Sequence, residues 1–391
     1  MNLTAPYILP DDADGALLIG RAFIPAGAVP AGPSPVCVRA DRVFDLSHLA
    51  PTCSQLLNLP DPAAAVHKAL ARAPVVGDVA ELLANSAADT RSVRKAYLLS
   101  PADLQAVRAS GVTFVSSMLE RVIEEHAKGD PDQAEQIRRS IGAEIGGELS
   151  KIKPGSEQAA RLKESLIKRG LWSQYLEVGI GPDAEVFNKA QPLASVGVGA
   201  EVGILRNSTW NNPEPEVVLA INAKGHVVGC TLGNDVNLRD WEGRSALLLS
   251  RAKDNNASCA LGPFIRLFDA NFTADDMRAT KLTVDVDGRD GFHMQGKSDV
   301  ATISRDPLQL VTHAMGKNHQ YPDGAMLFLG TQFAPIQDRD EPGRGFTHKI
   351  GDVVSIRAPR LGALVNRVNY CDALPPWGPP GTPVPPPPPG S

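Results

Sequence analysis

Three carboxylates in the middle of the chain have the spacing of metal ligands: Glu214, Glu216 and Asp235. Glu214 and Glu216 are two residues apart and precede an apolar run, 217–221, that is typical of a β-strand. Residues i and i+2 of a strand project from one face, so these two acids lie side by side. Neighbouring carboxylates repel each other unless a cation lies between them, and Mg²⁺ or Mn²⁺ prefers such oxygen ligands. The spacing suits a divalent metal site, although a Glu-x-Glu pair is more often a solvated strand face.

Asp235 and Lys253 are the candidates to complete this site. A turn at Gly225 separates the first strand from a second one expected over 226–232, and Asp235 follows that strand. A hairpin would bring Asp235 beside the two glutamates, and Lys253 is a candidate cation for the same pocket. From the residues alone two alternatives stay open: Asp235 can be a turn aspartate, and Lys253 a solvated lysine at a helix end.

The elements that must position these residues are short strands with a smaller number of helices. We expect strands over 16–24, 35–39, 42–46, 111–115, 217–221, 226–232, 281–286, 326–329 and 353–357. We expect helices over 62–72, 116–129, 130–142, 156–168 and 306–316, with one further helical turn at 103–108. The pattern predicts an α+β fold whose strand-rich part, from about 185 to 370, forms a β-roll or barrel-like sheet.

Length and local composition suggest three parts. The chain has 391 residues, which is enough for two domains. We expect a small N-terminal domain over 1–98 and a catalytic domain over 99–374. Residues 375–391 are rich in proline and are expected to be an extended, disordered tail.

Overall composition excludes several classes of protein. The net charge is −5 and no stripe of Lys and Arg is present, so we expect no nucleic-acid partner. Five scattered cysteines without Cys-x-x-Cys spacing suit reduced thiols in the cytoplasm. The N-terminus lacks the pattern of a signal peptide, and no apolar segment approaches the roughly 20 residues of a membrane span. We therefore expect a cytoplasmic enzyme with a small-molecule substrate and no membrane contact.

Four motifs carry a resemblance to a known family: PEPEV at 213–217, GNDVNLRD at 233–240, RAK at 251–253 and LGPF at 261–264. Together they resemble the fumarylacetoacetate hydrolase superfamily, over about 99–372. The resemblance implies that Glu214, Glu216 and Asp235 bind Mg²⁺ or Mn²⁺, and that Lys253 is the family lysine. It also implies that Thr331, in a Leu-Gly-Thr segment, borders the substrate.

A closer likeness covers nearly the whole chain except the proline-rich tail. The segments WNNPEPEVVL, LGNDVNLRD, EGRSALLLS and GLWSQYLEVGIGPDAE resemble the 2-keto-3-deoxypentonate (xylonate or arabinonate) dehydratases of that superfamily. This resemblance implies a hydro-lyase of pentose catabolism, such as D-xylose degradation, that forms 2,5-dioxopentanoate by enolisation and loss of the C4 hydroxyl. It also implies a homodimer or a higher homo-oligomer.

The helix expected over 116–129 is a candidate lid for the site. Glu120 or Glu124 would move the protons, and Arg121 would pair with the substrate carboxylate or orient a lid glutamate. Hydrogen bonds to substrate hydroxyls are expected from Ser116, Ser117 and Thr331. The alternative for these helix residues is an ordinary solvated amphipathic face.

Two other functions remain open. The rival within the superfamily is hydrolysis of a C–C bond in a 2,4-diketo acid, such as an acylpyruvate or a diketo-deoxypentonate. Those hydrolases resemble one another in a His-x-x-Glu lid motif, which this sequence lacks, since His126 follows Glu124 instead. The other alternative is a non-catalytic metal-binding or scaffold protein, in which Lys253 would be dispensable.

Overall fold

The computed structural model describes residues 1–26, 31–128, 130, 132–134, 136–137, 149, 152–168, 170 and 172–375. The expected tail beyond 375 and most of the helix expected over 130–142 lie outside these residues. Within them, no helix is both long enough and apolar enough to cross a membrane.

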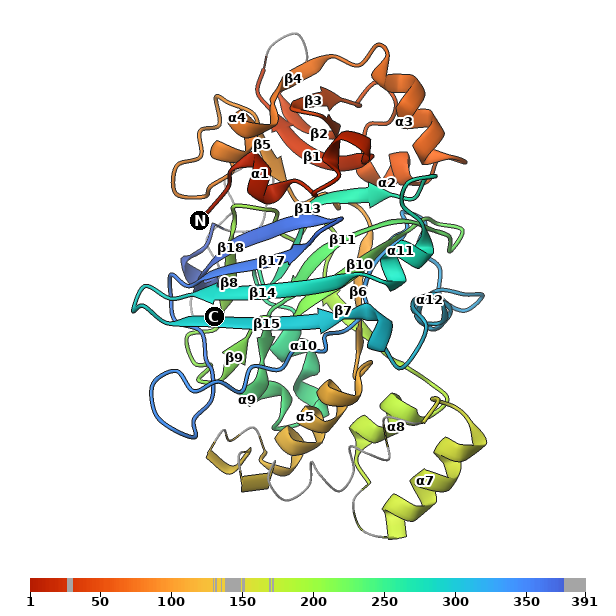
Figure 1. The fold of residues 1–391 in the computed structure, drawn as a ribbon, viewed down its shortest axis with the longest axis vertical. Helices are drawn as coiled ribbons and strands as arrows, with labels where there is room; N and C mark the ends of the chain where they lie inside the picture. Colours follow the sequence, from red (N-terminus) through yellow and green to blue (C-terminus); the bar gives the residue numbers. More distant parts are fainter. Residues whose placement is uncertain are drawn as a thin grey trace, which may run out of the picture.

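The larger of two main β-sheets runs through most of the molecule (Figure 1). In spatial order its strands are β4 (Val75–Asp78), β3 (Arg42–Asp45), β2 (Gly32–Arg39), β1 (Leu18–Ile24), β13 (Cys259–Leu267), β11 (Val227–Asp235), β10 (Pro215–Ile221), β16 (Ala325–Phe328), β6 (Ala106–Gly111) and β7 (Glu185–Ala190). One more strand, β5 (Tyr97–Leu99), pairs with β1. All neighbours are antiparallel except β16 and β6, which run parallel.

The second sheet packs against the first. Its strands are β15 (His293–Asp299), β14 (Lys281–Asp287), β17 (Val353–Ala358), β18 (Gly362–Tyr370) and β8 (Glu201–Ile204), in that order. A separate two-stranded ribbon joins β9 (Asn211–Asn212) to β12 (Asn237–Leu238). Val217 and Leu219 of β10 share one hydrophobic core with Val284 of β14 and Ile356 of β17.

The opposite face of the larger sheet is buried as well. Val218 and Ala220 of β10 belong to a second core, together with Leu56 of α2 (Cys53–Leu57) and Val66 of α3 (Pro62–Leu70). A strand that is buried on both faces carries an unbroken apolar run, which explains the composition of 217–221.

Helices gather at the two ends of the molecule (Figure 1). The N-terminal end has α1 (Ala5–Ile8), α2, α3 and α4 (Val79–Ala84), and the opposite end has α5 (Val115–His126), α7 (Glu157–Lys168) and α8 (Gln174–Ile180). The other α-helices among the described residues are α9 (Arg239–Glu242), α10 (Leu249–Lys253), α11 (Ala274–Arg278) and α12 (Pro307–Ala314). Met118 of α5, Leu166 of α7 and Leu176 of α8 form a separate small core.

The predicted α+β class is confirmed. The described strands form open sheets packed face to face, and neither sheet closes into a barrel.

The predictions of a helical turn at 103–108 and a strand at 111–115 were wrong. Instead Ala106–Gly111 is a strand, because β16 pairs with it on one side and β7 on the other, and α5 begins at Val115. Strands from both predicted domains share the larger sheet through the pairing of β1 with β13, and the division at 98 stays a prediction.

Candidate active site

The three predicted metal ligands lie together at the end of the β10–β11 hairpin. The strands pair Pro215 with Asn234 and Glu216 with Gly233, and the N–H of Asp235 donates to the carbonyl of Glu214 across 3.0 Å. In this register Glu214, Glu216 and Asp235 project from one face of the ribbon. All three side chains are buried, and one carboxylate oxygen from each lies within 4.8 Å of the others. We call these residues the acidic triad.

The surroundings of the triad disfavour the ionised form of one of its members, Glu216. Burial, together with the charges of Asp235 and Glu214, raises the pKa of Glu216 well above its ordinary value. Burial also acts to raise the pKa of Asp235, but Lys189 and Lys253 outweigh it and the net shift is downward. Three buried carboxylates with hard oxygen donors fit a Mg²⁺-like ion, which would let all three stay ionised.

Two lysines already approach the triad. The Nζ atom of Lys253, on α10, lies 2.5 Å from a carboxylate oxygen of Glu214 and 3.2 Å from one of Asp235. Burial alone would lower the pKa of Lys253, but Asp235 and Glu214 raise it overall, so the ammonium stays charged. Lys189, on β7, places its Nζ 2.9 Å from Asp235 and also donates to the backbone carbonyl of Lys253. Lys189 was not predicted as a site residue from the sequence. A lysine in a strand beside apolar residues could have indicated a buried cation with an acidic partner.

The segment after β16 closes another side of the triad. The N–H of Gly330 donates to Glu216 across 2.6 Å. Gly330 has a φ of +88°, and a Cβ there would lie 2.1 Å from Oγ1 of Thr113, so only glycine fits. Thr331 follows, with a buried side chain whose Oγ1 accepts from the N–H of Phe333. Thr331 is thus the residue after the one that contacts Glu216, and its contact with substrate stays a prediction.

Arg121 connects α5 directly to the triad. Its guanidinium lies 2.6 Å from Glu214, 2.5 Å from Glu124 and 2.8 Å from Glu242 of α9. Burial acts to lower the pKa of Arg121, but these carboxylates raise it overall. The contact with Glu124 matches the expectation that Arg121 orients a glutamate of the helix, while contact with a substrate carboxylate stays a prediction.

A second buried arginine holds the two predicted acid–base residues. Arg239, at the start of α9, donates to Glu124 across 2.6 Å and to Glu120 across 3.1 Å. Its guanidinium also stacks over the ring of Trp210, 4.3 Å from the ring centre. Arg239 lies in the motif GNDVNLRD, but we predicted no role at the site for Arg239 or for Glu242 from the sequence.

The two predicted serine ligands lie at the start of α5. The hydroxyl of Ser116 donates to the carbonyl of Gln332, and that of Ser117 donates to the carbonyl of Phe114, each across 3.0 Å. Both hydroxyl oxygens can still accept a hydrogen bond. Binding of substrate by these serines stays a prediction.

Buried polar atoms without a partner continue the face of the triad. Asn212 pairs with Asn237 in the β9–β12 ribbon, two residues beyond Glu214 and Asp235 along the two strands. Among the described residues, Oδ1 of Asn212 and both amide atoms of Asn237 have no hydrogen-bond partner, although both side chains are buried. Such atoms usually bind water or a ligand, so this end of the ribbon suits a substrate with hydroxyl groups.

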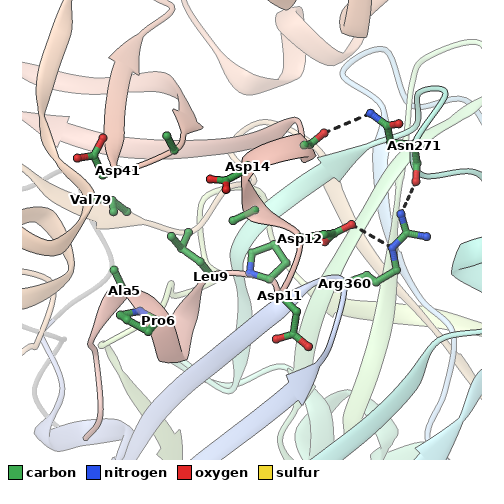
Figure 2. Close-up of a pocket in the computed structure, with 14 residues that line it drawn as sticks. Ala5, Pro6, Leu9, Asp11, Asp12, Asp14, Asp41, Val79, Asn271 and Arg360 are labelled. Carbon is green, nitrogen blue, oxygen red and sulfur yellow. Dashed lines mark hydrogen bonds and ion pairs between the residues drawn. The ribbon is translucent and has the colours of Figure 1, made fainter.

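A separate pocket of about 890 Å³ lies beside α1 at the N-terminal end (Figure 2). Asp11, Asp12, Asp14 and Asp41 line it, and Asp12 is already paired with Arg360. Because its acidic side chains are exposed or paired, this pocket lacks the closely spaced, buried carboxylates of the acidic triad.

Comparisons with known proteins agree with this geometry. Residues 180–369 match the family model described as fumarylacetoacetate (FAA) hydrolase C-terminal. A 2-dehydro-3-deoxy-D-arabinonate dehydratase of Saccharolobus solfataricus is 26% identical over 231 residues, which are 58% of this chain and 70% of that protein. A probable 2-keto-3-deoxyxylonate dehydratase of Haloferax volcanii is 29% identical over 219 residues, which are 55% of this chain and 68% of that protein.

A solved structure extends the likeness to nearly the whole fold. It is a 2-keto-3-deoxy-D-arabinonate dehydratase complexed with magnesium and 2,5-dioxopentanoate, and it aligns with a TM-score of 0.57 at 19% identity. The alignment covers 90% of this chain and 99% of that one. Residues 180–369 therefore match a domain of the fumarylacetoacetate hydrolase family, and the predicted family resemblance is confirmed over that range.

Proposed function

We propose that this chain is a metal-dependent hydro-lyase that converts a 2-keto-3-deoxypentonate into 2,5-dioxopentanoate. The observation that carries the proposal is the buried acidic triad with Lys253 against it, in a chain whose two curated relatives are named as dehydratases of such acids. A 2-keto acid presents a carboxylate oxygen and a keto oxygen, the pair that a divalent ion can chelate.

The acidic triad would hold Mg²⁺ or Mn²⁺, with one oxygen from each carboxylate. When bound, the ion supplies Lewis acidity that polarises the C2 keto group of the substrate. The ammonium of Lys253 lies beside the triad and stabilises negative charge at the C2 oxygen as the C3 proton leaves.

Glu120 and Glu124 are our candidates for removing the C3 proton. Both accept hydrogen bonds from Arg239, and Glu124 also accepts one from Arg121. The two carboxylates lie on one helix that Arg121 connects to Glu214, and this position beside the triad is the reason to test them as the base. Through its ion pair with Glu214, Arg121 would hold this helix next to the acidic triad.

Polar groups around the triad would bind the remaining oxygens of the substrate. Thr331, Ser116 and Ser117 are the hydroxyl ligands that the sequence suggested. Among the described residues, Oδ1 of Asn212 and the amide group of Asn237 have no partner, and they offer acceptors and a donor further along the same face. A substrate with hydroxyls at C4 and C5 would use such groups better than an apolar acyl chain.

An assay of dehydration tests the proposal. Purified protein with Mg²⁺ and 2-keto-3-deoxy-D-xylonate or D-arabinonate should form 2,5-dioxopentanoate, measured through a coupled semialdehyde dehydrogenase. EDTA should abolish the activity, and added Mg²⁺ should restore it. Release of pyruvate from an acylpyruvate, with no dehydration of any 3-deoxy acid, would refute the dehydratase and establish the C–C hydrolase.

We also propose a physiological setting. The reaction belongs to pentose catabolism in the cytoplasm, and the protein acts as a homodimer or a higher homo-oligomer. Light scattering of the purified protein tests the oligomer, and loss of growth on pentose in a deletion strain tests the pathway.

A further inference from the structure

The ribbon that carries the acidic triad continues beyond it in the same register. The β10–β11 hairpin places Glu214 opposite Asp235, whose N–H donates to the carbonyl of Glu214. Two residues away on each strand, Asn212 is paired with Asn237. Side chains two residues apart on a strand share a face, so these two asparagines lie next to the triad, about 7 Å along the ribbon. We call Asn212 and Asn237 the asparagine pair.

The asparagine pair is buried but incompletely hydrogen-bonded. Asn212 is 2% exposed and Asn237 is 0% exposed. Nδ2 of Asn212 donates to the carbonyl of Pro213 across 2.9 Å, which fixes the orientation of the amide and directs Oδ1 away as an acceptor. Within the described part of the chain, neither this Oδ1 nor the two amide atoms of Asn237 have a partner. The pair therefore offers both an acceptor and a donor, which are the two partners that an alcohol needs.

Asn211, on the opposite face of the same strand, is a useful contrast. Its Oδ1 accepts from the N–H of His348, and its Nδ2 donates to Oγ of Ser208. The fold thus satisfies a buried asparagine in this strand, as proteins usually do. The unpartnered atoms of the asparagine pair therefore indicate a ligand rather than a defect of the ribbon.

Helix α5 lies over the asparagine pair. Arg121 of the helix reaches Glu214 at the triad, and Arg239, further along the ribbon, reaches Glu124 of the helix. Arg121 also contacts Glu124, so this carboxylate lies between the two arginines, at the level of the asparagine pair. A substrate that extends from the triad to the asparagine pair would therefore pass beneath Glu124.

The next position along the ribbon is already filled. Trp210 follows Asn212 on the same face, and the guanidinium of Arg239 lies 4.3 Å from the centre of its ring. Trp210 also packs against Ile123 and Ala127 of α5. An aromatic ring and an ion-paired arginine therefore bound the asparagine pair on the side away from the triad.

We infer that the asparagine pair binds the C5 hydroxyl of the substrate and selects five-carbon acids that carry it. The inference rests on the proposed dehydration. With the C1 and C2 oxygens at the triad, the carbon chain extends along the ribbon and brings C5 to the asparagine pair. Oδ1 of Asn212 accepts the C5 hydroxyl proton, and Nδ2 of Asn237 donates to the C5 oxygen. The pair determines specificity, because the bonds that break lie at C3 and C4.

An analogue that lacks only the C5 hydroxyl tests this inference. 4-Hydroxy-2-oxopentanoate keeps the C3 protons and the C4 hydroxyl, so it can still lose water to give the conjugated acid 2-oxopent-3-enoate, which is measured by its absorbance. A site built to hydrogen-bond a hydroxyl rejects the analogue without it by about 10⁴-fold, because its buried polar groups stay unpaired. For the Mg²⁺-loaded native protein we expect kcat/KM to be lower by about this factor than with the better of 2-keto-3-deoxy-D-xylonate and D-arabinonate.

Asn237→Leu removes both free amide atoms and keeps the branched shape of the side chain. We expect kcat/KM for the sugar acid to fall by about 30- to 100-fold, because the C5 hydroxyl and Oδ1 of Asn212 lose a partner. With the analogue kcat/KM should not fall, because an apolar side chain suits the C5 methyl group. Asn212→Leu should shift the preference in the same direction. The ratio of the two values, measured on one sample, does not depend on the fraction of folded protein.

The matched control is Asn211→Leu, the same change on the opposite face of the strand. It removes the hydrogen bonds to His348 and Ser208, so the midpoint of urea unfolding should fall. The ratio of kcat/KM for the two substrates should stay at the native value.

Two results would overturn the inference and leave the dehydration standing. One is a native protein with equal kcat/KM for the sugar acid and the analogue. The other is an equal loss with both substrates in Asn237→Leu, which would show that the asparagine pair only supports the ribbon. By contrast, a native protein that dehydrates neither the pentonates nor the analogue would refute the proposed function itself.

Discussion

The two halves of the candidate site are held in place by different means. On one side, the acidic triad lies on the β10–β11 ribbon, and the backbone register alone puts its three carboxylates on one face. On the other side, Glu120 and Glu124 lie on α5, and two long arginine side chains connect them to the rest of the site.

This difference bears on how each half responds to change. A slip of β10 by one residue would move Val217 and Leu219 out of the core that they share with the second sheet and into the differently shaped core on the opposite face. The triad is therefore fixed by the same burial that stabilises the fold. The α5 half depends on buried ion pairs, which are costly to break when one partner is removed. We expect substitutions in the two halves to separate metal binding from stability.

Glu216→Gln should have the largest effect, and it should act on metal binding. Glu216 accepts from the N–H of Gly330, and an amide oxygen at that place can still do so. The variant loses one anionic ligand, so we expect Mg²⁺ affinity to fall by more than about 100-fold, because even partners of metal ligands are worth 10- to 100-fold. Calorimetric titration with Mg²⁺ measures the change.

The control for this variant is Asp14→Asn, which neutralises an exposed aspartate at the N-terminal end. It should leave Mg²⁺ affinity unchanged. Equal Mg²⁺ affinity in native protein and Glu216→Gln would exclude Glu216 as a ligand.

Arg239→Met should have the second largest effect, and it should act on stability. The substitution leaves the buried carboxylate of Glu124 with one arginine and removes the hydrogen bond from Arg239 to Glu120. We expect the free energy of unfolding to fall by about 3 kcal/mol, as for other buried pairs that lose one partner. Urea unfolding measures this loss, and Mg²⁺ affinity should change by less than about tenfold, because the strands hold the triad.

Two further variants sharpen this second prediction. Adding Glu124→Gln to Arg239→Met should restore part of the stability, since it removes the unpaired charge. Arg206→Met breaks an exposed pair with Asp372 and should leave the urea midpoint unchanged. If Arg239→Met were as stable as the native protein, the arginine contacts would not hold the α5 half.

The same difference explains what the sequence could predict. The apolar run 217–221 and the alternation of Glu214 with Glu216 are local patterns, and from them we could predict that the carboxylates of the triad lie together. Lys189 reaches the site because β7 joins the edge of the sheet through β6, and part of β6 was predicted as a helical turn. No local pattern indicates that pairing.

Arg239 shows a second reason why the prediction was incomplete. It contacts Glu124, which is 115 residues away along the chain. A side-chain contact over that separation depends on how α5 packs against α9, and hydrophobic periodicity does not determine this. Sequence therefore predicts a site well where backbone periodicity positions the residues, and poorly where long side chains do.

The smallest effects should come from the hydroxyls, and they test whether the α5 half binds substrate. We expect Thr331→Ala, Ser116→Ala and Ser117→Ala each to lower kcat/KM by about 3- to 10-fold, the value of one hydrogen bond. Thr331 should give the largest change because its side chain is buried next to Gly330, and exposed Ser116 the smallest. Mg²⁺ affinity should stay constant in all three, since no hydroxyl belongs to the triad. A loss confined to Thr331→Ala would mean that the serines of α5 do not bind the substrate. The acidic triad and the segment after β16 would then recognise it, and α5 would supply only Glu120, Arg121 and Glu124.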